Sequence, residues 1–288
     1  MKWIDYASAS SVQEAVDLLK GGGARPLAGG TDLIVNLRIR RLDPDTVVDV
    51  KGIPELNEVS YDASKGLTLG AAVPCYKIYN NKAVAKAYPG LIDVASLIGG
   101  TQIQGRASIG GNLTNAAPSG DSIPVLIALG AIANIAGPNG TRQVAVEDFC
   151  TGPGKTVLKQ GELLVSLSIP APVKGSGAQY MRFIPRNEMD IAVAGVGVSV
   201  VLENGTFKSA RISLASVAPT PLFVKAAGDA LVGKPVNDAS IAVAAGIARD
   251  AAKPITDMRG TIEYRKHLCE VLTRRGLNVA IERAKENK

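Results

Sequence analysis

Two segments with adjacent glycines constrain the fold of this 288-residue chain more than any other feature. Residues 26–33 read PLAGGTDL, and residues 107–115 read ASIGGNLTN. Adjacent glycines allow the backbone to approach another group closely and can turn successive N–H groups the same way. Each segment lies beside an apolar run and also carries hydroxyl, amide or carboxylate side chains. One Gly-Gly pair is usually a turn, whereas two such segments predict a diphosphate held between two backbone loops.

The composition favours a packed, folded protein. Hydrophobic residues make up 46% of the chain and charged residues 20%, a balance that excludes extensive disorder. The length allows two domains or three small ones. Aromatic residues make up only 4%, which argues against a stacking surface for single-stranded nucleic acid. Basic residues alternate with apolar ones near the C-terminus, so we expect an amphipathic helix there that docks on protein.

The cysteines and the N-terminus bear on the compartment. Cys75, Cys150 and Cys269 lie far apart and form no CxxC pair, so we expect no iron–sulfur cluster or structural zinc in this chain. Their odd number fits a reducing compartment. Residues 1–5 do not begin a signal peptide, and no run of apolar residues is long enough to span a membrane. We therefore expect a soluble cytoplasmic protein.

The first part of the chain alternates helix and strand patterns. Ser11 and Glu14 have the spacing of a capping box, and apolar residues follow at helical spacing over 12–19. Further elements are predicted as strands at 24–27 and 47–50 and a helix at 33–40. That helix follows the first glycine pair, so residues 29–32 are expected at a helix N-terminus, where N–H groups and the helix dipole favour an anion.

The rest of the chain divides at a Pro/Gly/Ser-rich segment, residues 170–177. Before it we predict strands at 66–72 and 162–169, helices at 90–98 and 123–129, a loop at the second glycine pair, and a hairpin of 131–136 with 142–146. After it we predict a hairpin of 191–202 with 207–217 and helices at 221–232, 238–252 and 261–285. Strands followed by helices indicate a compact α+β domain. The expected domains are 1–55, 56–175 and 176–288.

Several apparent catalytic motifs do not hold. Residues 152–156 read GPGKT, but Phe149 occupies a position where a phosphate-binding P-loop needs glycine, so a turn is the better interpretation. The Gly-Val-Gly at 195–197 lacks the third glycine of a dinucleotide fingerprint. His267 is the sole histidine, which excludes an imidazole metal site and a Ser–His–Asp triad. We therefore expect no catalytic residue and no metal ligand in this chain, and chemistry supplied by a bound ligand.

With these landmarks the sequence resembles the FAD-binding medium subunits of the xanthine dehydrogenase and carbon monoxide dehydrogenase family of molybdenum hydroxylases. The resemblance covers nearly the whole chain. Its strongest part is the second glycine segment continued by AAPSGDSIP at 116–124. Further landmarks are the ordered residues Phe149, Gly152, Thr156, Leu158, Glu162, Leu163, Ile169 and Pro170, then Arg186 with MDIA at 189–192, and Tyr264-Arg265 with LTRR at 272–275.

The resemblance implies an α+β protein with a two-lobed FAD-binding fold, a small α/β lobe and a larger α+β lobe, followed by a C-terminal domain of antiparallel sheet and helices. FAD would lie between the two lobes, with both glycine segments on its pyrophosphate. The residues implied as cofactor contacts are Leu27, Ala28, Gly29, Gly30, Thr31, Asp32, Leu33, Ser108, Ile109, Gly110, Gly111, Asn112, Asn115, Asp121, Leu164 and Arg182. Arg182 stands where some relatives carry lysine.

The resemblance also implies partners: a small subunit with two [2Fe–2S] clusters and a large subunit with the molybdenum cofactor, assembled as a dimer of heterotrimers. This oxidoreductase subunit would pass electrons from the clusters through FAD to an external acceptor. Two alternatives remain at this point. One is a self-contained flavin oxidase of the related fold, and the other is a non-redox nucleotide-binding protein.

Overall fold

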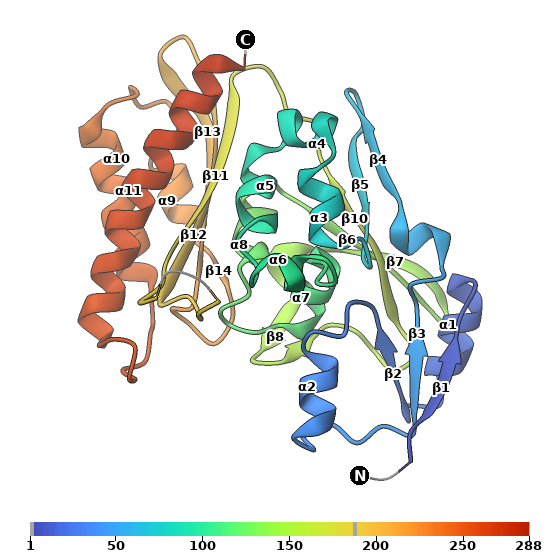
Figure 1. The fold of residues 1–288 in the computed structure, drawn as a ribbon. Coiled ribbons are helices and arrows are strands. Elements are labelled where there is room, and N and C mark those ends of the chain that lie inside the picture. The colour runs from blue at the N-terminus through green and yellow to red at the C-terminus, as the bar shows by residue number, and fades with distance from the viewer. Residues whose placement is uncertain (1–2, 187–188, 288) are drawn as a thin grey trace.

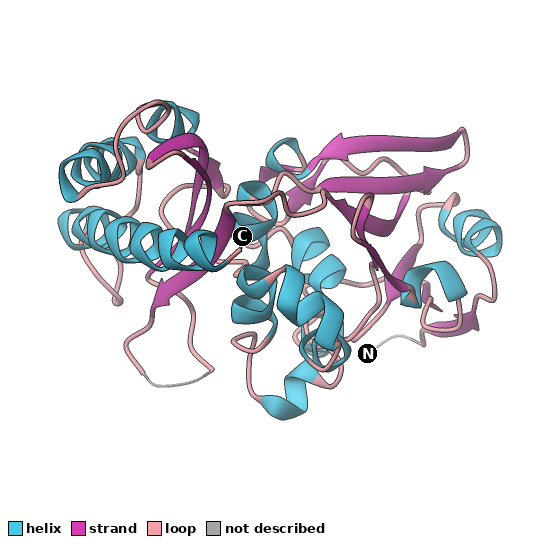
Figure 2. Ribbon diagram, turned by 90° about the horizontal axis from the view of Figure 1, so that it is seen from above, coloured by secondary structure: helices cyan, strands magenta, loops and turns pink. Residues whose placement is uncertain are grey.

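The computed structural model describes residues 3–186 and 189–287, so Met1 and Lys2 of the N-terminal stretch discussed above lie outside the described residues. The chain forms three larger sheets that follow one another along the sequence (Figure 1). The N-terminal sheet lies beside the central part, and the C-terminal sheet lies on the other side of it (Figures 1 and 2). Among the described helices, none is long and apolar enough to cross a membrane.

The N-terminal sheet is parallel, with strand order β1-β3-β2. Its elements are β1 (Asp5–Ser8), α1 (Val12–Leu19), β2 (Ala24–Leu27), α2 (Leu33–Arg38) and β3 (Thr46–Asp49). Central β3 is largely buried, whereas α2 has no buried residue. The capping box before α1 forms in part: Ser11 Oγ accepts from the Glu14 N–H at 3.2 Å, but the Glu14 carboxylate accepts from the Ser10 N–H rather than that of Ser11.

The central sheet is antiparallel and has strand order β4-β5-β10-β6-β7. Its strands are β4 (Val59–Asp62), β5 (Gly66–Gly70), β6 (Ile132–Gly137), β7 (Gly140–Ala145) and β10 (Leu163–Ile169). Short helices pack on it: α3 (Cys75–Tyr79), α4 (Lys82–Ala87), α5 (Pro89–Ala95), α6 (Thr101–Gln104), α7 (Ile109–Asn115) and α8 (Ser122–Ala128). The largest hydrophobic core lies between them.

Two 3-10 turns and a small hairpin complete the central part. The 3-10 turns are η1 (Pro54–Asn57) and η2 (Val146–Asp148). Strands β8 (Cys150–Gly152) and β9 (Lys155–Thr156) form a small hairpin around Gly154, whose φ is +68°. The GPGKT segment is therefore a turn, as the sequence indicated, and not a phosphate-binding loop.

The second glycine segment is a helix, which corrects the expected loop. Ser108 precedes α7, and its Oγ accepts a hydrogen bond from the Gly111 N–H at 3.0 Å. Glycine is disfavoured inside helices, so the residue pattern predicted no helix here. The helix forms because the serine cap holds its first turn and Ile109 and Leu113 bury against the central core.

The C-terminal sheet is antiparallel with strand order β11-β12-β13-β14. Its elements are β11 (Ser176–Phe183), β12 (Ala194–Glu203), β13 (Thr206–Ala215), β14 (Leu222–Phe223), α9 (Lys225–Asp229), α10 (Asp238–Ala251) and α11 (Ile262–Glu286). The long helices cover one face of this sheet, while α5 and α8 of the central part pack on the other (Figures 1 and 2). The sheet thus closes the central core as well as its own.

One expectation for this part needs correction. Residues 221–232 are not one helix: β14 comes first, and α9 spans five residues. The basic helix α11 lies against its own sheet, and Arg265 is 4% exposed, with bonds to the Val193 carbonyl and the Asp257 carboxylate. Sequence patterns also did not identify β11, which carries polar side chains on the face turned toward the central part.

Candidate functional site

The two glycine segments lie against each other in the structure. The Nε of Arg106, just before the second segment, donates a hydrogen bond to the carbonyl of Gly29 at 3.3 Å. A Cβ atom at Gly29 would overlap the Arg106 backbone carbonyl, so the first segment needs glycine there to reach the second. Both segments therefore border the same region, between the N-terminal sheet and the helices of the central part (Figure 1).

The other three positions of the two pairs are glycine for different physical reasons. Gly30 has φ +79°, a conformation that other residues rarely adopt. A Cβ on Gly110 would lie 2.5 Å from the carbonyl oxygen of Ala71, so this glycine lets α7 approach the chain that follows β5. At Gly111, by contrast, Ser108 Oγ, at 2.9 Å, is the sole described atom within 4 Å of a Cβ outside the neighbouring backbone. A side chain at Gly111 would therefore have to displace the Ser108 hydroxyl, its one close neighbour there.

The beginning of α7 offers backbone N–H groups close to Gly111. The first N–H groups of a helix have no partner within the helix. Ser108 Oγ accepts from Gly111, and the antiparallel bridge between Pro74 and Ser108 turns the Ile109 N–H toward the chain before α3. Gly110 is the residue of this turn that is left without an intrahelical acceptor. An anionic group next to Gly111 would find this donor and the positive end of the helix dipole.

The side chains of the first glycine segment are half-buried or exposed. Leu27, Ala28, Thr31 and Leu33 are half-buried, whereas Asp32 is exposed. Asp32 precedes α2 but makes no side-chain capping hydrogen bond. The helix begins at Leu33 as expected, so the turn of Gly29 and Gly30 does stand at a helix N-terminus.

The two predicted asparagines of the second segment differ in their contacts. Asn112 accepts two hydrogen bonds with its Oδ1, from Ser122 N–H at 3.1 Å and from Ser122 Oγ at 2.6 Å. It therefore fixes the beginning of α8, next to Asp121. Asn115 is half-buried in the last turn of α7. Asn112 thus supports the site through α8.

Asp121 is held by two residues of the C-terminal sheet. Its Oδ1 accepts from Tyr180 Oη at 2.5 Å, and its Oδ2 accepts from Arg182 Nη1 at 2.7 Å. Arg182 also donates from Nη2 to the Leu97 carbonyl at 2.9 Å. These contacts join α8, β11 and the end of α5, so a predicted site residue from each side of the 170–177 segment meets here.

The charges in this cluster are buried. The Asp121 side chain is 13% exposed and that of Arg182 is 7% exposed. Burial raises the pKa of the Asp121 carboxyl, while the Arg182 charge and the Tyr180 hydrogen bond act in the opposite direction. Burial and the neighbouring carboxylate raise the pKa of Tyr180 well above its ordinary value, so its hydroxyl stays a donor.

The side chain of Leu164 is part of the hydrophobic core and not of the polar cluster around Asp121. It is 2% exposed and belongs to the central hydrophobic core, on β10 beside a register irregularity between Leu164 and Ser166. A ligand contact at this residue would come from its backbone.

The sequence analysis did not identify two residues of this region, Tyr180 and Arg106. Recognition of β11 would have placed Tyr180 on the same face as Arg182, two residues away.

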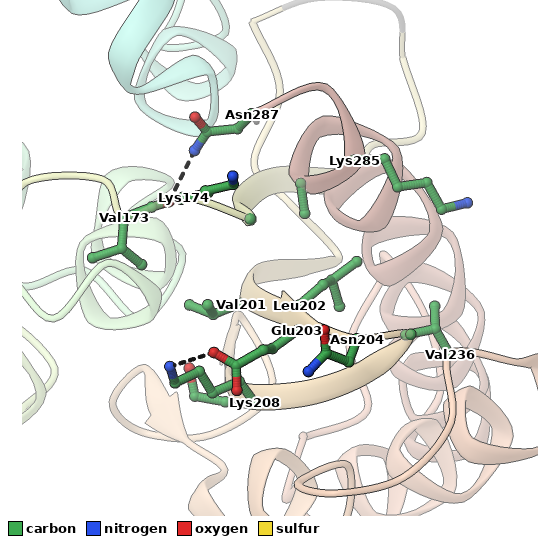
Figure 3. A pocket seen from close by; sticks show the side chains of 14 residues that line it. Val173, Lys174, Val201, Leu202, Glu203, Asn204, Lys208, Val236, Lys285 and Asn287 are labelled. Atoms are coloured by element: carbon green, nitrogen blue, oxygen red, sulfur yellow. Dashed lines mark hydrogen bonds and ion pairs between the residues drawn. The ribbon is translucent and has the colours of Figure 1, made fainter.

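The open cavity in Figure 3 lies elsewhere. It has a volume of about 910 Å³ and lies where the turn between β12 and β13 meets the end of α11. Lys174, Lys208 and Lys285 line it, and Lys208 pairs with Glu203 at 2.8 Å. It contains none of the predicted site residues.

Nucleophilic or metal chemistry has no support in the described part of the chain. No group of three or more His, Cys, Asp or Glu side chains there could hold a metal ion. Burial raises the pKa of Cys75 and Cys269 to about 12, and that of Cys150 to about 11. These thiols remain protonated and inert at neutral pH. His267 is exposed on α11.

Comparison with known protein families decides the assignment of this fold. Residues 2–172 match the family described as "FAD binding domain in molybdopterin dehydrogenase", and residues 179–280 match "CO dehydrogenase flavoprotein C-terminal domain". The chain belongs to the FAD-binding medium subunits of the molybdenum hydroxylase family. It is thus a flavoprotein subunit of the molybdopterin-dependent oxidoreductases, as the resemblance implied.

Individual relatives agree over almost the full length of this medium subunit. It is 34% identical to the carbon monoxide dehydrogenase medium chain of Afipia carboxidovorans, over 98% of each chain. It is 30% identical to the xanthine dehydrogenase FAD-binding subunit of Escherichia coli O157:H7, over 97% of this chain and 96% of the relative.

Solved structures agree as well. A carbon monoxide dehydrogenase chain from Oligotropha carboxidovorans superposes with a TM-score of 0.93 at 33% identity, over 98% of this chain and 99% of the other. Quinoline 2-oxidoreductase from Pseudomonas putida 86 gives 0.91 at 30% identity, over 99% of each chain. The α+β fold with an FAD-binding part and a C-terminal antiparallel sheet domain is therefore confirmed.

The residues of this chain fit a flavin dinucleotide. The second glycine pair lies in the first turn of α7, and a helix N-terminus suits a diphosphate. In addition, Arg182 Nε is buried and has no hydrogen-bond partner among the described residues. The Nε of Arg265 is buried and unpaired in the same way, so the unpaired donor of Arg182 is compatible with a ligand but not specific for one.

Proposed function

We propose that this chain is the electron-transfer subunit of a heterotrimeric molybdenum hydroxylase. In this proposal electrons come from the [2Fe–2S] clusters of a small subunit and leave through FAD to an external acceptor. A large subunit holds the molybdenum cofactor and oxidises the substrate. The observation that carries the proposal is the contact between the two glycine segments at Gly29 and Arg106, with the N-terminus of α7 directly after it in the chain. That arrangement suits a dinucleotide, and the described residues include no metal-binding group.

Within the proposal, the backbone of the two glycine segments binds the pyrophosphate. The contacting residues are Leu27, Ala28, Gly29, Gly30, Thr31, Asp32, Leu33, Ser108, Ile109, Gly110, Gly111 and Asn112, with Asn115, Asp121, Leu164 and Arg182 around the remainder of the cofactor. Bound FAD supplies acceptance of single electrons and delivery of two. The polypeptide orients the cofactor, excludes water and sets the charge around it. No catalytic side chain and no metal ligand are assigned to this chain.

We further propose that the chain divides into an N-terminal lobe of residues 1–55, a second lobe of 56–175 and a C-terminal domain of 176–288. Each proposed part holds one of the larger sheets. The assembly proposed is a dimer of heterotrimers, and a cytoplasmic location is supported by three free cysteines.

The alternatives of a self-contained oxidase and a non-redox nucleotide-binding protein find no specific support. The chain corresponds end to end to medium chains, and its C-terminal part matches a CO dehydrogenase flavoprotein domain rather than an additional catalytic domain.

Purification of the chain alone and from its native host tests the proposal. The isolated chain is expected to bind about one FAD and to oxidise no alcohol, amine, aldehyde or N-heterocycle with oxygen as acceptor. A tagged chain in the host is expected to retain a small protein with iron–sulfur absorption and a large protein containing molybdenum. Turnover by the isolated chain would support the oxidase instead, and a colourless protein that binds no added FAD would contradict the flavin site.

A further inference from the structure

Strand β11 presents different partners on its two faces. Met181 and Phe183 pack against the core of the C-terminal sheet and its helices, whereas Tyr180 belongs to the hydrophobic core of the central part. Tyr180 and Arg182 are two residues apart and therefore point to the same side of the strand. The C-terminal sheet thus sends two polar groups into the wall of the central part, where Asp121 receives both.

The hydrogen bond of Tyr180 is deeply buried. The tyrosine is 1% exposed, and its hydroxyl lies 2.5 Å from Asp121 Oδ1. Its backbone N–H, on the free edge of the sheet, donates to Asp93 of α5 at 3.3 Å. Tyr180 is therefore held by its main chain at Asp93 and by its hydroxyl at Asp121.

The surroundings of Asp121 leave few groups that could replace this donor. The titratable and charged groups placed against its carboxylate are Tyr180 and Arg182, both from β11. Helix α7 presents Asn112, which is neutral and bonded to Ser122. The end of α5 contributes the Leu97 carbonyl, which binds Arg182 and not Asp121. Loss of the tyrosine hydroxyl would leave one carboxylate oxygen without its donor.

We propose that Tyr180 is a positioning residue of the flavin site, whose hydroxyl keeps Asp121 charged and oriented beside Arg182. The inference rests on the proposed function, because Asp121 and Arg182 are placed at the cofactor there. The phenol donates to the charged form of the carboxyl and so stabilises it against protonation. With that bond in place the Asp121–Arg182 pair carries no net charge. Without it, Asp121 takes up a proton more readily and the arginine charge stays uncompensated in the wall of the site.

The pH dependence of FAD affinity tests this role in the full-length chain. FAD is titrated into the apoprotein by flavin fluorescence at a series of pH values, for wild type, Tyr180→Phe, and a protein with 3-fluorotyrosine at position 180. The pH midpoint at which FAD affinity changes as Asp121 is protonated is expected to move upward by about one pH unit or more in Tyr180→Phe. The fluorinated phenol is a stronger donor of similar size, so the midpoint is expected below that of wild type.

Two controls separate positioning from general stability. Tyr88→Phe removes the same hydroxyl from another buried tyrosine, whose Oη donates to the Pro170 carbonyl at 3.0 Å, and should leave the pH profile unchanged. Asp121→Asn in the Tyr180→Phe background should remove this change in affinity. If the pH profiles of both position-180 variants coincide with that of wild type, Tyr180 has no positioning role. Should the phenylalanine variant not fold, the fluorotyrosine protein decides by itself. Failure of wild type to bind FAD would contradict the proposed function instead.

Discussion

Arg106 donates a hydrogen bond from Nε to the carbonyl of Gly29, across 77 positions of sequence. The arginine is exposed, whereas the backbone carbonyl of the same residue packs against the Gly29 Cα. One residue therefore sets the spacing between the two glycine segments by its main chain and ties them together by its side chain. Its guanidinium also adds positive charge where the proposed pyrophosphate binds.

Arg106→Ala is expected to weaken FAD binding about tenfold, since it removes one hydrogen bond and one nearby positive charge, together worth roughly 1.4 kcal/mol. Stability without FAD should change by less than about 0.5 kcal/mol because the side chain is exposed. Fluorescence titration of the apoprotein measures the first effect, and urea unfolding the second. Arg275→Ala, an exposed arginine of α11, makes the same charge change and should leave FAD affinity as it is. Equal affinities for the Arg106 variant and wild type would remove Arg106 from the site.

Gly111→Ala is expected to lower FAD affinity strongly while the protein stays folded. The new methyl group would displace Ser108 Oγ, 2.9 Å away, and would stand where the pyrophosphate is proposed to bind. Loss of that cap costs about 1 kcal/mol, and replacing glycine inside a helix gains about as much. The ratio of flavin to protein, measured together with circular dichroism, tests this. Retention of full flavin occupancy would contradict the assigned position of α7.

Gly110→Ala and Gly30→Val are expected to act on the fold itself. A Cβ at position 110 would meet the backbone of Ala71, and overpacking of this kind costs about 1–3 kcal/mol. Valine at position 30 would have to adopt φ +79°, which is strained for a β-branched residue. Both variants should therefore have a lower midpoint of urea unfolding before FAD is added, unlike Gly111→Ala. Wild-type midpoints for either variant would show that the local backbone adapts.

FAD is expected to be released intact when the protein is denatured. Cys75 and Cys269 are fully buried, and His267 lies on α11, on the face of the C-terminal sheet away from the glycine segments (Figure 1). No cysteine or histidine in either glycine segment could form a covalent link. Acid precipitation followed by filtration and chromatography should find the flavin in the filtrate, as FAD. Flavin that stays on the precipitated polypeptide, or FMN in the filtrate, would contradict noncovalent binding of FAD.

Arg283→Ala is expected to lower the free energy of unfolding by about 3 kcal/mol. Arg283 of α11 forms a two-bonded ion pair with Asp93 of α5, at 2.6 and 2.9 Å, and also donates to the Ala178 carbonyl. Both side chains are at least three-quarters buried, and removal of one partner leaves the other charge without compensation. Urea unfolding measures the change, with Arg274→Ala on the exposed side of the same helix as control. Equal losses in both variants would mean that the pair adds nothing.

Local chemistry made much of the fold predictable. The elements of the N-terminal sheet, the hairpin of β6 and β7, and helices α10 and α11 follow from periodicity, caps and turn residues that act over a few positions. Prediction failed at α7 and β11. The glycines of α7 have a low helix propensity, so the helix was not predicted. The polar residues of β11 have their partners 59 and 61 positions away in the sequence.

The sequence by itself determined the local elements, the two glycine segments and, through its ordered landmarks, the family. Tertiary structure decided how those segments meet and what each of their glycines packs against. It also decided that Asp121 is held by Tyr180 and Arg182 across the 170–177 segment. The reason is physical: periodicity reports which face of an element is buried, but not which distant residue it is buried against. Pairing of a buried carboxylate with a tyrosine and an arginine depends on the packing of two sheets and the helices between them.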